Sequence, residues 1–343
     1  MTVHPVIDLL RRPTTWLGLL VTTLSLIVLL SVINFSDLSV ILGGADLRFI
    51  VLGIGLLTLT VFVRAFRWQA VLRAGTPLRA AFDAENIGMM INNLLPLRLG
   101  EPVRALVLTR TTGVPVAEGL SSIVIIRVAD MIAILTLLGT VIPAFTVSDS
   151  VRAAGYGTLA IAGSLTAFIV IGALAHTRLA ALINHLAQIL LPASLSKKLS
   201  AWAADFLNGL AVLKQGRRLI TLIIATGVLW GLYALTYHIL LMALVPHPPL
   251  AWAVLATCTA SLSTAVPSSP AYVGVYDAAV AFTLSGYIGQ DTALGYAIIL
   301  HSIDFIIVLI FGVISLVSSG ASLDLIVSKA AILGRPTPKE LSS

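Results

Sequence analysis

Two pairs of ionisable residues lie within long apolar stretches of the sequence and are the first candidates for chemistry. Arg127 and Asp130 are three residues apart, so on a helix they share a face and can pair. His301 and Asp304 repeat this spacing in a later apolar stretch. An ionised group at the centre of a bilayer costs about 2.5–3.5 kcal/mol on insertion scales. Each pair therefore predicts either a polar pathway or a buried contact that fixes helix packing.

Histidine titrates near neutral pH, so the second pair could form a proton relay, with a buried, hydrogen-bonded histidine as the structural alternative. No His-Glu-x-x-His pattern and no third ligand at helical spacing accompany His301. No P-loop, Gly-x-Ser-x-Gly motif or paired cysteine is present, since Cys258 is the lone cysteine. We therefore expect no metal, no cofactor and no catalytic residue.

The densest polar cluster combines helix-breaking residues with side chains that can bind an anion. Proline and glycine interrupt a helix and free backbone groups, and guanidinium groups can hold phosphate through several donors each. Ordinary charge anchoring explains the arginines but not their Asn-x-x-Pro-x-Arg-x-Gly-Glu arrangement. The pattern favours a site for a phospholipid or polyprenyl phosphate headgroup. The members are Asn93, Pro96, Arg98, Gly100, Glu101 and Arg104.

A second interrupted segment lies later in the chain. Pro267, Pro270 and Gly274 predict a broken helix, and Tyr272 and Asp277 offer a hydroxyl and a carboxylate beside the break. We include both polar residues among the candidate substrate-binding groups.

The composition requires these residues to be positioned inside a membrane. The chain has 343 residues, of which 58% are hydrophobic and 10% charged. A soluble domain carries about 25% charge, so this chain cannot form an ordinary charged surface. Complete spans need about 20 apolar residues. We predict six, at 16–35, 49–66, 119–142, 154–175, 219–245 and 293–318.

The basic residues predict the orientation of these spans. All but three of the 21 lie on the side of the membrane that holds both termini, the exceptions being Arg48, Arg127 and Arg152. The positive-inside rule then places both termini in the cytoplasm, with the protein in the cell (inner) membrane. Arg64 and Arg67 are interpreted as anchors at the end of the second span. The net charge of +6 follows from this topology, and no nucleic-acid motif accompanies it.

Two apolar segments, 81–98 and 250–290, do not fit as complete spans. Basic residues flank 81–98 on both sides, and both ends of 250–290 must lie on the other side. We therefore predict two re-entrant hairpins that enter from opposite faces. A pair of amphipathic surface helices is the alternative for 81–110, and similar surface helices are expected across 176–218.

The two hairpins resemble each other at an offset of 174 residues, which aligns Pro96 with Pro270, Gly100 with Gly274 and Asp130 with Asp304. With three spans and one hairpin per half, the second half is inverted in the membrane. Inverted repeats with broken helices are typical of transporters. We predict an all-α, polytopic single membrane domain over 1–343, with repeats at about 16–142 and 154–318.

Three segments carry a family resemblance: NNLLPLRLGEPVRALVLTR (92–110), IIRVAD (125–130) and VPSSPAYVGVYDAA (266–279). They resemble the transmembrane, flippase-like domain of lysylphosphatidylglycerol synthases, a family that includes stand-alone members. In the last segment the family often has further glycines and a glutamate where Ala271, Tyr272 and Asp277 stand. The chain ends at Ser343 without room for an aminoacyl-transferase domain, so the resemblance does not imply lipid aminoacylation.

Taken together, the sequence predicts a lipid flippase or transporter in which a phosphate-bearing headgroup engages Arg98, Arg104 and Arg127. The expected partner is a membrane lipid. A membrane-embedded enzyme acting on a lipid-linked substrate, and a non-catalytic partner of a separate lipid-modifying enzyme, remain as alternatives.

Overall fold

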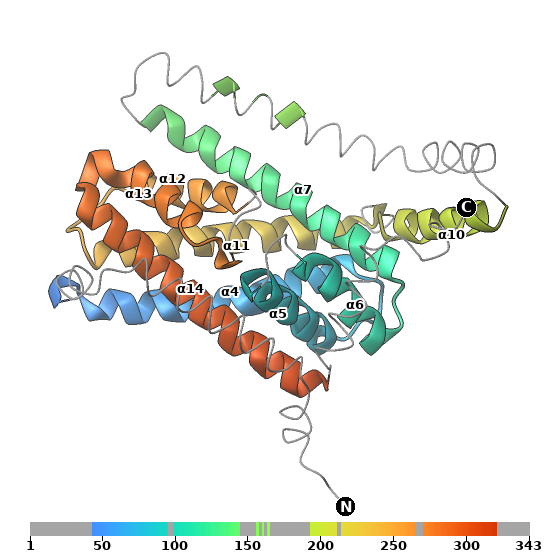
Figure 1. The fold of residues 1–343 in the computed structure, drawn as a ribbon. Helices are drawn as coiled ribbons and strands as arrows, with labels where there is room; N and C mark the ends of the chain where they lie inside the picture. The colour runs from blue at the N-terminus through green and yellow to red at the C-terminus, as the bar shows by residue number, and fades with distance from the viewer. Residues whose placement is uncertain are drawn as a thin grey trace, which may run out of the picture.

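The computed structural model describes residues 43–94, 99–144, 156–157, 160, 163–164, 193–210, 214–264 and 270–320. All regular structure within these ranges is helical (Figure 1), which confirms the expected all-α polytopic membrane fold. The predicted spans 16–35 and 154–175 lie wholly or mostly outside the described residues. So do the candidate residues Pro96, Arg98 and Pro267.

Within the described ranges, four helices are long and apolar enough to cross a membrane: α4 (Leu47–Val71), α7 (Val116–Val141), α11 (Gly216–Met242) and α14 (Gln290–Ser319). They contain 25 to 30 residues each, or about 38–45 Å, against about 30 Å of hydrocarbon. Their outward faces keep large apolar side chains exposed, as at Phe62, Ile224 and Ile314. Lipid is the environment that such faces require. The helices confirm four of the predicted spans.

Contacts between helix termini define the two ends of this bundle. The Asp46 amide, which precedes α4, donates to the carbonyl of Ala243 after α11, at 3.0 Å. Beyond the other end of α4, Arg218 Nη1 donates to the Leu72 carbonyl at 2.5 Å. The ends are called the Asp46 end and the Leu72 end below.

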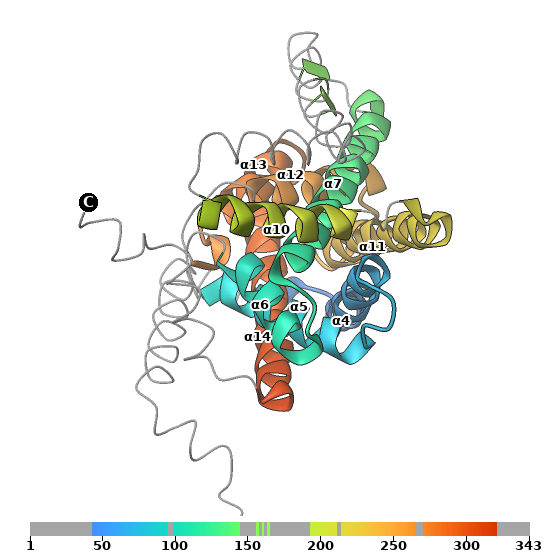
Figure 2. The ribbon, with the colours of Figure 1, turned by 90° about the vertical axis from the view of Figure 1, so that its right-hand side faces the viewer.

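The first hairpin, α5 (Leu78–Leu94) and α6 (Gly100–Thr112), enters from the Leu72 end. Across its tip the Gly100 amide donates to Asn92 Oδ1 at 2.8 Å. A β-carbon at Gly100 would lie 1.9 Å from the Gly88 carbonyl oxygen, so this close approach requires glycine. Most of α5 is buried against α4, α6 and α14, and Figure 2 shows the hairpin between α4, α10 and α14. The alternative of surface helices over 81–110 is therefore wrong.

The second hairpin enters from the Asp46 end. It contains α12 (Leu250–Ser263), the short 3-10 helix η4 (Pro270–Tyr272) and α13 (Val275–Ile288). Because η4 packs against α5, the tips of the two opposed hairpins meet inside the bundle. An order of one long, two short and one long helix thus occurs twice. This repeated order is consistent with the predicted inverted repeat. The repeat and its boundaries remain a prediction.

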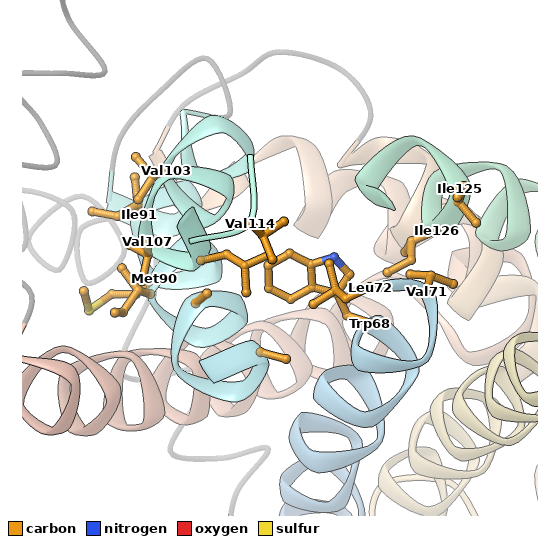
Figure 3. Packing of buried hydrophobic residues seen from close by; sticks show 14 of the residues in the cluster. Trp68, Val71, Leu72, Met90, Ile91, Val103, Val107, Val114, Ile125 and Ile126 are labelled. Atoms are coloured by element: carbon orange, nitrogen blue, oxygen red, sulfur yellow. The ribbon is translucent and has the colours of Figure 1, made fainter. Parts of the chain in front are cut away.

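Trp68 anchors the first hairpin to α4. The side chain is fully buried, and its Nε1 donates to Ser122 Oγ of α7 at 2.8 Å. Trp68 belongs to a buried apolar cluster that includes side chains from both arms of the hairpin (Figure 3). The members of this cluster near Trp68 come from α5, α6, the loop after α6 and the first half of α7, and include Met90, Ile91, Val103, Val107, Val114, Ile125 and Ile126.

Only part of the predicted surface connector 176–218 is described. In it, α10 (Ala193–Leu210) packs along α7. The short 3-10 helix η2 (Ile142–Ala144) follows the end of α7. Trp202 remains exposed and stacks on Phe206 with ring centroids 5.5 Å apart. One face of α10 is thus buried and the other is open, as in an amphipathic helix.

Opposed hairpins predict opposite labelling of two exposed positions. In a Cys258→Ala background, we expect Thr111→Cys, at the end of α6, and Gln290→Cys, at the start of α14, to react with an impermeant maleimide from opposite faces of oriented vesicles. The Cys258→Ala parent, without any cysteine, is the control. Labelling of both positions from one face would contradict the arrangement.

Candidate functional site

The two hairpin tips meet at a cavity of about 220 Å³. Its walls come from α4, α5, α6, α7, α11, α12, η4, α13 and α14, so nearly every described element contributes. Polar side chains from several of these apolar helices line it. Seven charged residues line it: Arg64, Arg67, Arg104, Arg127, Glu85, Asp130 and Asp304.

The structure brings most of the predicted site residues together. Those that line the cavity are Asn93, Arg104, Arg127, Asp130, Tyr272, His301 and Asp304. Glu101 and Asp277 lie behind it and contact lining residues instead of the cavity itself. Gly100 begins α6, Pro270 begins η4, and Gly274, with φ of 85°, immediately precedes α13. The predicted helix breaks thus lie at the hairpin tips.

Asp130 of α7 pairs with Arg67 of α4, and not with Arg127 as expected. The Arg67 guanidinium is 5% exposed and contacts both carboxylate oxygens, with Nη2 3.3 Å from Oδ2. Trp230 Nε1 of α11 also donates to Asp130 Oδ1 at 3.0 Å. Spacing along α7 put Arg127 and Asp130 on one face, but a donor from the neighbouring helix reaches the carboxylate. The interpretation of Arg67 as a membrane-surface anchor is therefore wrong.

Arg104 and Arg127 are joined through Glu101. Arg104 Nη1 lies 2.5 Å from Glu85 Oε2 of α5, and its Nε lies 3.3 Å from Glu101 Oε2. Arg127 of α7 forms an ion pair with the other oxygen of Glu101. Arg104 also stacks over the Trp68 ring, 4.7 Å from its centroid. These contacts connect both arms of the first hairpin to α4 and α7.

Arg64 differs from the other three arginines. Its side chain lines the cavity and is only 7% exposed, yet no carboxylate of the described chain lies within 4.0 Å of it. Glu85 and Asp304 act on it electrostatically, and it shares a side-chain hydrogen bond with Tyr233. Asp304 likewise lines the cavity without an ion pair or hydrogen bond to any described residue. A buried cation and an acid thus face the cavity unpaired, which is unfavourable unless a ligand or water completes them.

Sequence reasoning missed Arg64 because it ended the second span at residue 66. The helix continues to Val71, which places Arg64 two turns inside it. Arg64 and Arg67 have the same spacing of three as Arg127 and Asp130, so the shared face could have signalled an inward-facing pair.

His301 bonds to the second hairpin and not to Asp304 as expected. Its Nδ1 lies 2.9 Å from Asp277 Oδ1 of α13, and its Nε2 lies 2.7 Å from the Ala271 carbonyl oxygen of η4. The Tyr276 ring packs on the imidazole with centroids 4.8 Å apart. The tip of this hairpin is therefore attached to α14 through one imidazole.

The chemistry available to the cavity is recognition of a polar, anionic group. Unpaired guanidinium donors remain at Arg64 Nε, Arg67 Nε and Arg104 Nη2 within the described part of the chain. Hydroxyls of tyrosine, threonine and serine surround them. Across the described ranges, no three histidine, cysteine or acidic residues come together to hold a metal ion.

Comparison with known proteins identifies the family. The family model described as "Lysylphosphatidylglycerol synthase TM region" matches residues 15–312, so the chain belongs to this family. The expected family resemblance is therefore confirmed, and the chain is a multi-pass membrane protein of that family. Among solved structures, none matches this chain.

Two curated proteins are similar to the chain at 25% and 27% sequence identity. The chain is 25% identical to the glycosyltransferase AglD of Haloferax volcanii, over 96% of this chain and 58% of that protein. It is 27% identical to a UPF0104 membrane protein of Methanocaldococcus jannaschii, over 66% of this chain and 92% of that protein. The chain thus spans little more than half the length of the first relative.

The Arg67–Asp130 pair predicts a large stability effect. We expect Asp130→Asn to lower the free energy of unfolding by about 3 kcal/mol, because it leaves the buried Arg67 charge uncompensated. The double variant Arg67→Met, Asp130→Leu should recover most of this loss. Thermal unfolding of the purified protein in detergent measures both, with the exposed Asp291→Asn as control. Unchanged melting of Asp130→Asn would contradict the assignment.

Proposed function

We propose that this member of the lysylphosphatidylglycerol synthase TM region family moves a lipid with a phosphate headgroup between the two leaflets. The observation that carries the proposal is Arg64, a buried cation that faces the cavity and has no carboxylate partner among the residues that the structure describes. The cavity lies between hairpins that enter from opposite ends of the bundle. The lipid's acyl or polyprenyl tail would stay in the surrounding hydrocarbon.

The headgroup phosphate would bind to Arg64 and to the remaining donor of Arg104. Guanidinium groups bind phosphate through parallel, charge-assisted hydrogen bonds, which are about twice as strong as neutral ones. Arg127 lines the cavity although 47% of its side chain is exposed, so it lies where the cavity opens. There it would meet an arriving headgroup first. Arg98, expected to take part, lies outside the described residues.

Movement between leaflets requires that the cavity open in turn toward each end. The two tips close it from opposite directions, so displacement of one hairpin opens one route. Broken helices at the contact between inverted halves serve this purpose in transporters. We place the protein in the cell membrane with both termini cytoplasmic, following the distribution of its basic residues.

An enzymatic role is the second candidate, because one relative is named a glycosyltransferase. Glu85, Glu101, Asp130 and His301 are all committed to contacts with other side chains, which leaves Asp304 as the uncommitted acid lining the described cavity. A role as a non-catalytic partner of a lipid-modifying enzyme is the third.

Arg64 provides the sharpest test. In liposomes containing the purified protein, we expect Arg64→Gln to slow movement of the probe lipid about tenfold or more, since a hydrogen bond to a charged group contributes about 1.5–3 kcal/mol. Two probes are compared in separate arms: an acyl-labelled fluorescent phosphatidylglycerol and a short-chain polyprenyl phosphate. The arm in which the wild type is active identifies the lipid class.

Arg48→Gln, an exposed arginine at the start of the same helix, is the matched control and should move lipid at the wild-type rate. Arg64→Lys retains the charge and should retain part of the activity. A folded Arg64→Gln protein with wild-type rates would contradict the proposed site. Conversion of either probe into a new lipid would favour the enzyme.

A further inference from the structure

The contacts of His301 fix how many protons it shares with Asp277. The Ala271 carbonyl oxygen can only accept a hydrogen bond, so His301 Nε2, at 2.7 Å, must carry a proton and donate it. On the other side of the ring, Nδ1 lies 2.9 Å from Asp277 Oδ1. A bare ring nitrogen and a carboxylate oxygen are both acceptors. One further proton therefore lies between them.

That proton has two alternative positions. Either an imidazolium faces a carboxylate, or a protonated Asp277 donates to a neutral imidazole. The pair has no net charge in both cases, which suits side chains that are 6% and 7% exposed inside a membrane protein. Asp277 Oδ2 also accepts a bond from the Gly274 amide at 2.9 Å, so the carboxylate is fixed at the start of α13.

The same contact controls the tip of the second hairpin. Ala271 and Tyr272 have φ of 55° and 60°, a left-handed conformation that residues other than glycine seldom adopt. The bond from His301 holds this strained turn against α14. Loss of the shared proton would leave a neutral imidazole with one N–H for two acceptors, the Asp277 carboxylate and the Ala271 carbonyl oxygen. Whichever ring nitrogen loses its proton then faces an acceptor with a lone pair, so one of the two contacts that hold the tip is lost. Because Ala271 and Tyr272 line the cavity, its wall would move with them.

Other ionisable groups face the pair from each neighbouring helix. His301 itself lines the cavity, so its proton can pass to water there. The sequence of α12 contains no charged residue. The facing groups are Asp304 of α14, Tyr276 of α13, Tyr233 and Tyr237 of α11, Arg64 of α4 and Glu85 of α5.

We propose that Asp277 and His301 form a proton-binding site whose occupancy positions the second hairpin tip and couples lipid movement to proton movement. The inference rests on the proposed function and adds its coupling ion. Binding joins one proton from cavity water to the neutral imidazole and carboxylate and closes the contact. Release returns the proton to the cavity and frees the tip. Low pH therefore favours the closed contact and high pH favours its separation.

Asp277→Asn separates proton binding from structure. An asparagine amide can donate to His301 Nδ1 while its oxygen accepts from the Gly274 amide, so the contact can still close and open as a neutral hydrogen bond, but without the proton that Asp277 and His301 share. Asp277 does not line the cavity, so lipid contacts are unchanged. Asp291→Asn, an exposed carboxylate at the start of α14, is the matched control.

The experiment uses the full chain in liposomes with the two probe lipids, a clamped membrane potential and a pH dye inside. At matched pH, exchange of probe between leaflets reports the proposed function. A gradient of one pH unit should then shift the wild-type leaflet ratio by up to about tenfold, the limit for one proton per lipid, and the dye should report proton movement. Asp277→Asn should exchange probe at matched pH but show no shift, whereas Asp291→Asn should respond as wild type.

The proton coupling would be overturned if the wild-type leaflet ratio did not respond to the pH gradient, or if the Asp277→Asn ratio did respond. In either case, exchange of probe lipid at matched pH would leave the proposed function intact. Absence of exchange by the wild type with both probes would overturn both. If Asp277→Asn does not fold, His301→Gln replaces it. That variant removes the imidazole and with it the shared proton, so a retained response to the gradient would refute the site.

Discussion

Hydrocarbon cannot replace a lost hydrogen bond or solvate a charge, and this constraint explains how the protein is arranged. The four long helices meet it at their outward faces, which are apolar. The interrupted helices and the buried charges are sheltered from hydrocarbon at the same place, because the hairpin tips and seven charged side chains of the described residues line one cavity. A broken helix is tolerated at such depth where it borders protein or water. The fold therefore places its most costly features in a single location.

The ion pairs at this location have different consequences. Arg67 with Asp130, and Arg104 with Glu85, join helices and leave little capacity for a ligand. Burial of such pairs is a poor source of stability but a strong constraint on which helices are neighbours. Besides these pairs, the cavity holds Arg64 and Asp304, which form no ion pair within the described part of the chain, and the contact of Asp277 with His301 lies beside it. Each of these belongs to or faces a hairpin tip, which links ligand binding to hairpin position.

The sequence predicted the elements better than the contacts between them. Hydropathy and length located four described spans, and proline and glycine located both hairpin tips, because these signals are local. The partners of Asp130 and His301 were wrong, since spacing along one helix shows a shared face but not which neighbouring helix approaches it. Asp130 and its partner Arg67 are distant in the sequence, and so are His301 and Ala271. Each pair is brought together only by the packing of different helices. Arg64 was missed because the helix runs one turn further than its most apolar segment.

The most direct test of the central claim is a cryo-electron microscopy map of the protein in nanodiscs that contain the lipid it moves. We expect headgroup phosphate density within hydrogen-bonding distance of Arg64, between the two hairpin tips. Phosphate density found only at the two ends of the bundle, with Arg64 bonded directly to Asp304, would contradict it.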